Sequence, residues 1–230
     1  MKAIILAAGI GSRLGRPVPK PLTMLDNGET IIGRQIAILK KFMSVHDIII
    51  VTGFKKELIM EEHPELLFAY NNEYDTTNTS KSLLRGLAKA DKNADCIWLN
   101  GDVVFQEEVV EQVLNFKKSC MAVHNRSTGD EEVKYRLSPN GSICEISKQV
   151  VNGLGEAVGI NKICPEQIEL LSNYLAMCKP DDYFEKGIEM AINEGLEIYP
   201  VDITSYVCEE IDFIDDLNSI NKKIKDNNAL

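Results

Sequence analysis

The 230-residue sequence has no long apolar run. Its apolar stretches, among them Ala3–Ala8 and Ile48–Val51, are far shorter than the roughly 18 residues that a membrane-spanning helix requires. The chain starts on a strand-like pattern instead of a charged segment followed by a long apolar segment, so we expect no signal peptide. These absences predict a cytoplasmic protein that has no membrane as a partner.

Paired cysteines and clustered histidines are also lacking. The six cysteines occur singly and none has C-x-x-C spacing, which argues against a zinc site or a disulfide framework and favours buried free thiols. The three histidines show no partner spacing, so we expect structural roles for them. The cysteines are Cys96, Cys120, Cys144, Cys164, Cys178 and Cys208, and the histidines are His46, His63 and His124.

An excess of positive charge is lacking as well, because the net charge is −10. Nucleic acid is therefore not an expected partner, since binding to its phosphates needs a cationic surface. The charge is unevenly distributed: residues 1–41 hold seven Lys or Arg against two acids, and the remainder holds 18 against 33. The positive charge is concentrated near the N-terminus.

Strand-like and helix-like segments alternate along the chain without a repeat or a low-complexity linker, which predicts one α/β domain over residues 1–230. Helices between strands favour parallel pairing, with helices on both faces of the sheet. Asn140-Gly141 is a strong hairpin signal, so we expect a small antiparallel insertion at about 131–162. The expected strands are 2–7, 46–53, 66–71, 94–102, 120–125, 196–203 and 205–211, and the expected helices are 30–43, 54–63, 79–90, 107–119, 165–178, 181–195 and 213–225.

The segment Leu6–Leu22, LAAGIGSRLGRPVPKPL, follows the first predicted strand and fits neither of two common phosphate-binding motifs. A Walker loop ends in G-K-[ST], which is absent here. A dinucleotide-binding fingerprint needs a third glycine that opens a helix, but Leu14 takes that position and three prolines prevent an immediate helix. The segment therefore predicts a stiff loop.

Glycines and cations share this loop. Gly9 and Gly11 let backbone N–H groups face phosphate oxygens, and Arg13 and Lys20 bring two full charges from its two ends. A G-x-G pattern alone is also typical of a plain structural turn. Joined to the two cations and the prolines, it predicts a phosphate-binding site.

The same loop resembles the signature of the nucleotidyltransferase (pyrophosphorylase-like) superfamily. Later segments resemble, in the same order, the branch of that superfamily that contains phosphocholine, 2-aminoethylphosphonate and phosphoglutamine cytidylyltransferases. The loop segment GRPVPKPL is shorter than its counterpart in many sugar-1-phosphate enzymes, which argues against a sugar acceptor. The later segments are NNEYDTTNTSKSLLRGL, WLNGDVVF, EEVKYRL, ICEISK, GEAVGINKI, LEIYPVDI and EEIDFIDDL.

The resemblance implies a three-layer α/β/α, Rossmann-like fold with a mostly parallel mixed sheet. It also implies a magnesium-dependent transfer of CMP from CTP to a small phosphorylated or phosphonate acceptor, with release of pyrophosphate, for decoration of cell-surface polysaccharide or lipid. We expect a monomer or a homodimer. The alternatives are a sugar-1-phosphate nucleotidyltransferase and a non-catalytic nucleotide-binding regulatory protein. A metal-dependent glycosyltransferase would show D-x-D at the strand end, where this chain has GDVV.

The resemblance pairs Asp102 and Asp212 as ligands of one Mg²⁺, and their carboxylates suit its preference for oxygen. Asp102 could instead cap the following helix. Asn78 and Ser82 could select cytosine without charge, and their other interpretation is helix capping. The expected nucleotide-binding residues are Leu6, Ala7, Ala8, Gly9, Gly11, Ser12, Arg13, Lys20, Asn78, Ser82 and Gly101, of which Arg13 and Lys20 are also expected to be catalytic.

The acceptor site is expected on and around the insertion. The resemblance places Lys148, also a catalytic candidate, against the acceptor's phosphate and Glu156 against its amino end; a solvated lysine and a surface acid are the alternatives. Lys134 and Arg136 alternate on one face of a hairpin strand and could assist. Tyr183 could lie over an ammonium group, although its segment also fits an ordinary acidic helix start.

Overall fold

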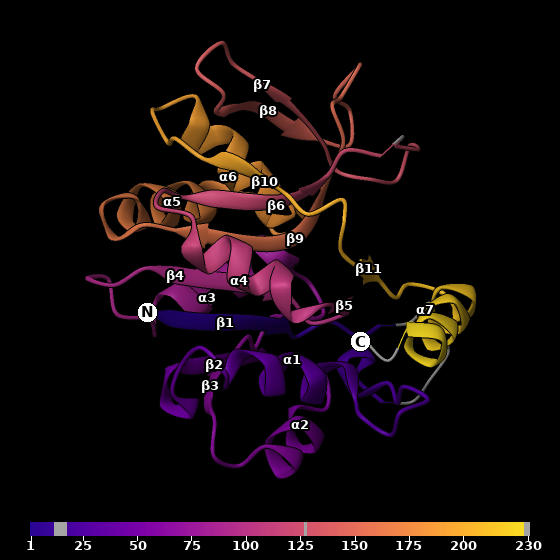
Figure 1. The fold of residues 1–230 in the computed structure, drawn as a ribbon. Coiled ribbons are helices and arrows are strands. Elements are labelled where there is room, and N and C mark those ends of the chain that lie inside the picture. The colour runs from indigo at the N-terminus through magenta and orange to yellow at the C-terminus, as the bar shows by residue number, and fades with distance from the viewer. Residues whose placement is uncertain (12–17, 127, 228–230) are drawn as a thin grey trace.

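The structure, a computed structural model, describes residues 1–11, 18–126 and 128–227. Its main sheet has the strand order β10-β6-β9-β4-β1-β2-β3 (Figure 1). In the central strands nearly every side chain is buried, as is typical of strands covered on both faces. The strands are β1 (Lys2–Ala7), β2 (Ile48–Thr52), β3 (Leu67–Tyr70), β4 (Cys96–Asn100), β6 (Cys120–His124), β9 (Glu156–Ile163) and β10 (Tyr199–Asp202).

Helices cover both faces of this sheet, which confirms the predicted three-layer α/β/α fold. One apolar core lies between the sheet and α1 (Ile31–Leu39), α2 (Lys56–Glu62) and α4 (Glu107–Asn115). The other lies between the sheet and α3 (Thr79–Leu87), α5 (Pro165–Met177) and α6 (Phe184–Ile192).

The sheet is mixed because β9 runs antiparallel to both of its neighbours, β4 and β6, whereas β1 is parallel to β2 and β4. The first residue of β9, Glu156, therefore lies opposite His124, the last residue of β6. One edge of the sheet thus gathers the carboxyl ends of the parallel strands and the beginning of β9. Ligands of open α/β sheets bind at such an edge.

The predicted hairpin is formed by β7 (Lys134–Leu137) and β8 (Ile143–Ser147), and Gly141 in its turn has a φ of 82°. The antiparallel part of the structure is larger than the small insertion that the sequence predicts, however. The expected segment 131–162 ends in β9, which lies in the centre of the main sheet and buries seven of its eight residues. The hairpin lies on the side of the sheet where β10 is the outermost strand (Figure 1).

The C-terminal segment packs against residues from the middle of the sequence. The short strand β11 (Cys208–Glu210) pairs antiparallel with β5 (Val103–Phe105), and α7 (Ile214–Asn227) packs a small apolar core against them. This places residues 208–212 beside the loop that follows β4. Two 3-10 turns, Lys20–Leu22 and Val45–Asp47, complete the regular structure of the described chain.

All six cysteines are free thiols, as predicted, and five are buried; Cys144 is half-buried. Within the described residues, no helix is both long and apolar enough to cross a membrane.

We predict that Trp98→Ala lowers the free energy of unfolding by about 3–5 kcal/mol. Trp98 is fully buried in β4, and its ring meets Phe184 of α6 edge to face at 5.8 Å between centroids, so truncation leaves a cavity between sheet and helix. Urea unfolding measures the change. Trp98→Phe, which keeps a ring in the site, should cost clearly less, and equal losses for both variants would contradict this account.

Candidate functional site

A cleft of about 1080 Å³ lies along the edge of the sheet identified above. Its lining comes from segments far apart in sequence: the glycine loop after β1, Lys20, the end of β4, the start of β9, the start of α6 and the segment around β11. One end lies at the glycine loop. The other, the hairpin end, is the part lined by His124, Glu132, Lys148, Glu156, Tyr183 and Glu185.

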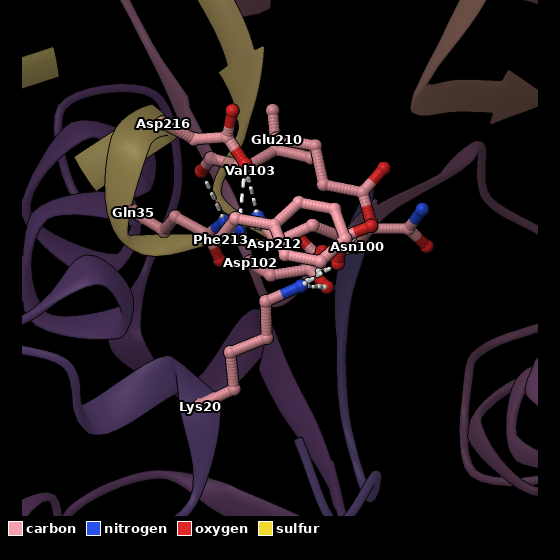
Figure 2. A network of polar contacts seen from close by, with 9 residues as sticks. All are labelled: Lys20, Gln35, Asn100, Asp102, Val103, Glu210, Asp212, Phe213 and Asp216. Carbon is pink, nitrogen blue, oxygen red and sulfur yellow. Dashed lines mark hydrogen bonds and ion pairs between the residues drawn. The ribbon is translucent and has the colours of Figure 1, made fainter. Parts of the chain in front are cut away.

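Lys20 lies at the centre of a polar network (Figure 2). Its ammonium Nζ lies 2.7 Å from Asp102 Oδ2, 2.5 Å from Asp212 Oδ1 and 3.8 Å from Glu210 Oε1. The Lys20 side chain is only 10% exposed. We refer to Asp102, Glu210 and Asp212 as the carboxylate cluster.

Local structure fixes each member of this cluster. Asp102 follows β4, and its carbonyl accepts a hydrogen bond from the Ile211 N–H. Glu210 ends β11, and Asp212 comes two residues later, a spacing that places alternate side chains on one side of an extended chain. At the start of α7, the Asp216 carboxylate accepts hydrogen bonds from the N–H groups of residues 212 and 213, which holds this turn in place.

The cluster has the charge balance of a cation site. Burial alone lowers the pKa of Lys20, but the charge of Asp102 and the hydrogen bonds to Asp102 and Asp212 outweigh it and raise that pKa above its usual value. Partial burial and the nearby Asp102 carboxylate raise the pKa of Glu210 to about 8. The structure thus holds three closely spaced carboxyl groups, and one ammonium offsets part of their negative charge.

The same cluster fits a divalent metal. One ligand oxygen from each of its three carboxylates lies within 4.8 Å of the others. Asp102 Oδ1 is buried and has no hydrogen-bond partner among the described residues, so this oxygen is left for a ligand. A set of carboxylate oxygens alone suits Mg²⁺ or Mn²⁺. The structure brings Asp102 and Asp212 together, and their role as ligands of one Mg²⁺ stays a prediction. Glu210 was missed, and the E-x-D spacing on a short strand was the signal for it.

The glycine loop forms the wall next to Lys20. Gly11 has a φ of 65°, and a Cβ there would lie 2.7 Å from the Lys20 Cβ, so glycine lets the lysine stem pass. A Cβ on Gly9 would meet nothing within 4 Å, because this backbone faces open space. Leu6, Ala7, Gly9, Gly11, Lys20 and Gly101 all line the cleft. Ser12 and Arg13, predicted beside them, lie outside the described residues.

A small pocket of about 60 Å³ adjoins the glycine loop and is lined in part by Ala8, Asn78 and Ser82. Asn78 caps α3: its Oδ1 accepts from the Thr79 N–H, and its amide donates to the Asp181 carbonyl. The capping interpretation is therefore correct for Asn78. The hydroxyl of Ser82 accepts a hydrogen bond from Asn71 at 3.1 Å and can still donate one of its own.

Lys148, Glu156 and Tyr183, which were expected to bind the acceptor, line the hairpin end together. The Lys148 ammonium lies 5.7 Å from the centroid of the Tyr183 ring and 3.3 Å from Glu131 Oε2. Burial, with a smaller contribution from the charge of Glu132, raises the pKa of Glu156 to about 7.

Lys134 and Arg136 were also expected at the acceptor site, but neither lines the cleft. The Lys134 ammonium donates to the Gly129 carbonyl, and Arg136 pairs with Glu145 across the hairpin while half exposed. Strand alternation explains the difference, because the residue between them, Tyr135, faces the core and turns both cations to the outer face.

Glu185 is a site residue that the sequence analysis did not identify. It lies in the first turn of α6, lines the cleft and is 9% exposed, and burial raises the pKa of its carboxyl to about 7. Its Oε2 has no hydrogen-bond partner within the part of the chain that the structure describes. An acidic residue at the start of a helix is usually exposed to solvent, so nothing in the sequence distinguishes Glu185 as a site residue.

Comparisons with known proteins find similar sequences and similar structures. The sequence model of the MobA-like NTP transferase domain matches residues 3–169. The choline-phosphate cytidylyltransferase of Haemophilus influenzae is 28% identical over 242 residues, which cover 99% of this chain and 99% of that enzyme. The CMP-5'-(3-aminopropyl)phosphonate synthase of Streptomyces rubellomurinus is 34% identical over 122 residues, which cover 49% of this chain and 19% of that longer protein.

Solved structures also superpose on almost the whole chain. The CTP:phosphocholine cytidylyltransferase of Streptococcus pneumoniae superposes with a TM-score of 0.78 at 21% sequence identity, covering 97% of this chain and 98% of that one. This likeness confirms the predicted fold.

We predict that Lys20→Met increases the affinity of the nucleotide-free protein for Mn²⁺ at least about tenfold. The lysine ammonium and a metal ion compete for the same carboxylates, so removing the ammonium removes the competitor. Thermal unfolding at rising Mn²⁺ measures the affinity, since a ligand at 100 times its Kd stabilises by about 2.7 kcal/mol. Lys41→Met, which removes an exposed partner of Glu107, is the control. An unchanged Mn²⁺ response in Lys20→Met would rule out the competition.

We predict that the free energy of unfolding of Glu185→Gln, relative to that of the wild type, increases by on the order of 2 kcal/mol as pH rises from 5 to 8. The pKa of Glu185 is raised in the folded protein to about 7, so its contribution to stability is full below the unfolded pKa near 4.5 and is lost as pH rises through 7. Urea unfolding at the two pH values measures the difference. Glu189→Gln, on the same helix and paired with Lys186, should show no such trend.

Proposed function

The chain belongs to the MobA-like NTP transferase family, as its motifs indicated, and on that premise we propose that it transfers CMP from CTP to a small phosphorylated or phosphonate acceptor and releases pyrophosphate. One observation carries the proposal. A single cleft joins a glycine loop, Lys20 and the carboxylate cluster to a second end where Lys148 lies among acidic side chains. The two ends suit two anionic substrates that must react with each other.

The glycine loop and Lys20 bind the triphosphate in this proposal. The open space at Gly9 lets phosphate oxygens approach backbone N–H groups, and the Lys20 stem passes Gly11 before its ammonium meets the cluster. The carboxylate cluster holds Mg²⁺, which when bound neutralises charge on the reacting phosphates. With the carboxylates bound to a metal ion, the Lys20 ammonium would be free to pair with phosphate instead.

The cytidine base occupies the small pocket beside the glycine loop. Its lining is uncharged, and the Ser82 hydroxyl can donate to a base carbonyl. A site of this kind discriminates by hydrogen bonds, because a wrong base leaves buried polar groups unpaired.

The acceptor's anion pairs with Lys148 and its amino end faces the carboxylates of the hairpin end. An acceptor oxygen that is already ionised at pH 7 attacks the α-phosphorus in line; the new P–O bond forms as the bond to the β-phosphate oxygen breaks, and pyrophosphate leaves. The attacking oxygen carries no proton to remove, so the site needs no general base. The chain's residues act by positioning and by neutralising charge.

The product of this reaction is a CMP-activated small molecule. Such a compound is a donor for a second transferase, and we propose decoration of cell-surface polysaccharide or lipid as its use. Phosphocholine, 2-aminoethylphosphonate and phosphorylated glutamine are the candidate acceptors.

We predict that the protein releases pyrophosphate from CTP and Mg²⁺ in the presence of one of these acceptors, and does so much faster than from UTP, ATP or GTP. A pyrophosphate assay over the four nucleotides and the acceptor panel, with glucose 1-phosphate included, measures this. Preference for UTP with glucose 1-phosphate would favour a sugar-1-phosphate enzyme. Nucleotide binding without turnover on any acceptor would favour a regulatory protein.

In the same assay, Asp212→Asn should lower kcat at least about a hundredfold, because it removes one charge from the carboxylate cluster. Asp215→Asn is the matched control, since this exposed acid in the first turn of α7 does not line the cleft. Near-normal activity in Asp212→Asn would remove the cluster from the mechanism.

A further inference from the structure

Asn71 is a buried asparagine that contacts the wall of the small pocket, and its side chain is fully hydrogen-bonded. It follows β3, is fully buried, and lines neither the cleft nor the small pocket. Its Oδ1 accepts from Arg85 Nε at 2.9 Å and from the backbone N–H of Glu73 at 3.1 Å. Its Nδ2 donates to Thr77 Oγ1 at 3.0 Å and to Ser82 Oγ at 3.1 Å.

The two groups that face Oδ1 determine which way the Asn71 amide points. The Arg85 Nε–H and the Glu73 backbone N–H can only donate, so the amide oxygen has to face them and the amide nitrogen has to face the two hydroxyls. Arg85 is held in turn by the Glu73 carboxylate, whose Oε2 lies 2.5 Å from Arg85 Nη2. Exchanging the amide oxygen and nitrogen would leave these donors unpaired, at about 1–3 kcal/mol for each buried group.

The two hydroxyls that Asn71 contacts both line the small pocket, and they differ in what they can offer a ligand. Thr77 Oγ1 donates its proton to the Glu73 carbonyl at 2.6 Å, so toward the pocket it can only accept. Ser82 Oγ accepts from Asn71, and its own proton has no acceptor among the described residues. Because Ser82 is only 5% exposed, this proton requires an acceptor from a ligand.

This pair of hydroxyls is complementary to one edge of cytosine. Cytosine presents two neighbouring acceptors, O2 and N3, beside the N4 amine, which donates. Uracil has an N3–H donor and an O4 acceptor at the last two positions. With Ser82 at O2 and N3 and Thr77 at N4, cytosine is satisfied, whereas uracil would oppose N3–H to a donor and O4 to an acceptor. Both hydroxyl oxygens bond the same Asn71 nitrogen, so they lie close together, as neighbouring base atoms require.

Resting on the proposed function, we infer that Asn71 is a positioning residue for base selection: it holds Ser82 as the donor and Thr77 as the acceptor that together favour CTP over UTP. Asn71 does not touch the nucleotide and acts through these hydroxyls. In Asn71→Asp an oxygen replaces Nδ2 and takes the Ser82 proton, which leaves the serine as an acceptor toward the base.

Nucleotide preference tests the inference. Asn71→Asp should lower the ratio of kcat/KM for CTP to that for UTP at least about tenfold, with the KM of the acceptor unchanged. Asn72→Asp is the matched control, because it makes the same substitution at the neighbouring exposed residue and should keep the wild-type ratio. A merely structural role for Asn71 would weaken turnover of both nucleotides alike, and an unchanged ratio in Asn71→Asp overturns the inference.

A double variant tests whether Asn71 acts through Ser82. Ser82→Ala removes the hydroxyl, so adding Asn71→Asp to it should change the ratio by less than about twofold. A further tenfold loss in the double variant overturns this route.

An uncharged variant covers the case in which Asn71→Asp fails to fold. Asn71→Ala removes the amide and leaves the Ser82 hydroxyl without its fixed orientation. The CTP to UTP ratio should again fall, by at least about threefold, because the unoriented hydroxyl can serve either base. A wild-type ratio in a folded Asn71→Ala overturns the inference.

Calorimetric binding of CTP and of UTP, with Mg²⁺ and without an acceptor, separates the inference from the proposed function. The wild type should bind CTP more tightly, and Asn71→Asp should lose this preference, even if no acceptor of the panel is turned over and the proposed transfer fails. Equal affinity of the wild type for both nucleotides overturns the inference and leaves cytidylyl transfer to be judged by the pyrophosphate assay.

Discussion

The ammonium of Lys20 joins three distant parts of the chain in one contact. The lysine belongs to the loop after β1, Asp102 follows β4, and Asp212 follows β11 near the C-terminus. Closely spaced carboxylates repel one another unless a cation lies between them, and Lys20, or a metal ion in its place, offsets this repulsion where the segments meet. The shape of the cleft at this point and its fit for a divalent cation depend on this balance.

Much of the fold could be predicted from the sequence because its pattern is local. Apolar strands that alternate with amphipathic helices determine the three layers, and Asn140-Gly141 marked the hairpin. The place of β9 could not be predicted in this way. It pairs with β4 and β6, and this pairing depends on contacts between residues far apart in the sequence. Its Lys162 is buried and bonds carbonyls at the end of α4, but no local sequence pattern distinguishes this lysine from a surface lysine.

Those site residues could be predicted whose type is poorly suited to any role except binding a ligand. Glycines beside cations, and acids at the ends of buried strands, are poorly suited to building a core, so their presence points to a ligand. The structure brings Gly9, Gly11, Lys20, Asp102 and Asp212 to one cleft. Prediction was weaker at the hairpin end, because a glutamate or lysine there is equally typical of a solvated surface. Burial decides between the two, and burial follows from tertiary contacts: it selects Glu185 and leaves Arg136 in solvent.

The position of β9 in the sheet also means that β6 is synthesised before the strands with which it pairs. The strand β6 pairs with β9 and β10, and both follow it in the chain. A ribosome therefore completes β6, whose five residues are all buried in the finished protein, well before either neighbour exists. During that interval two apolar strand edges lack their partners, and such edges pair readily with other chains. The pace of translation between residues 125 and 202 thus sets how long each nascent molecule is exposed to misassembly.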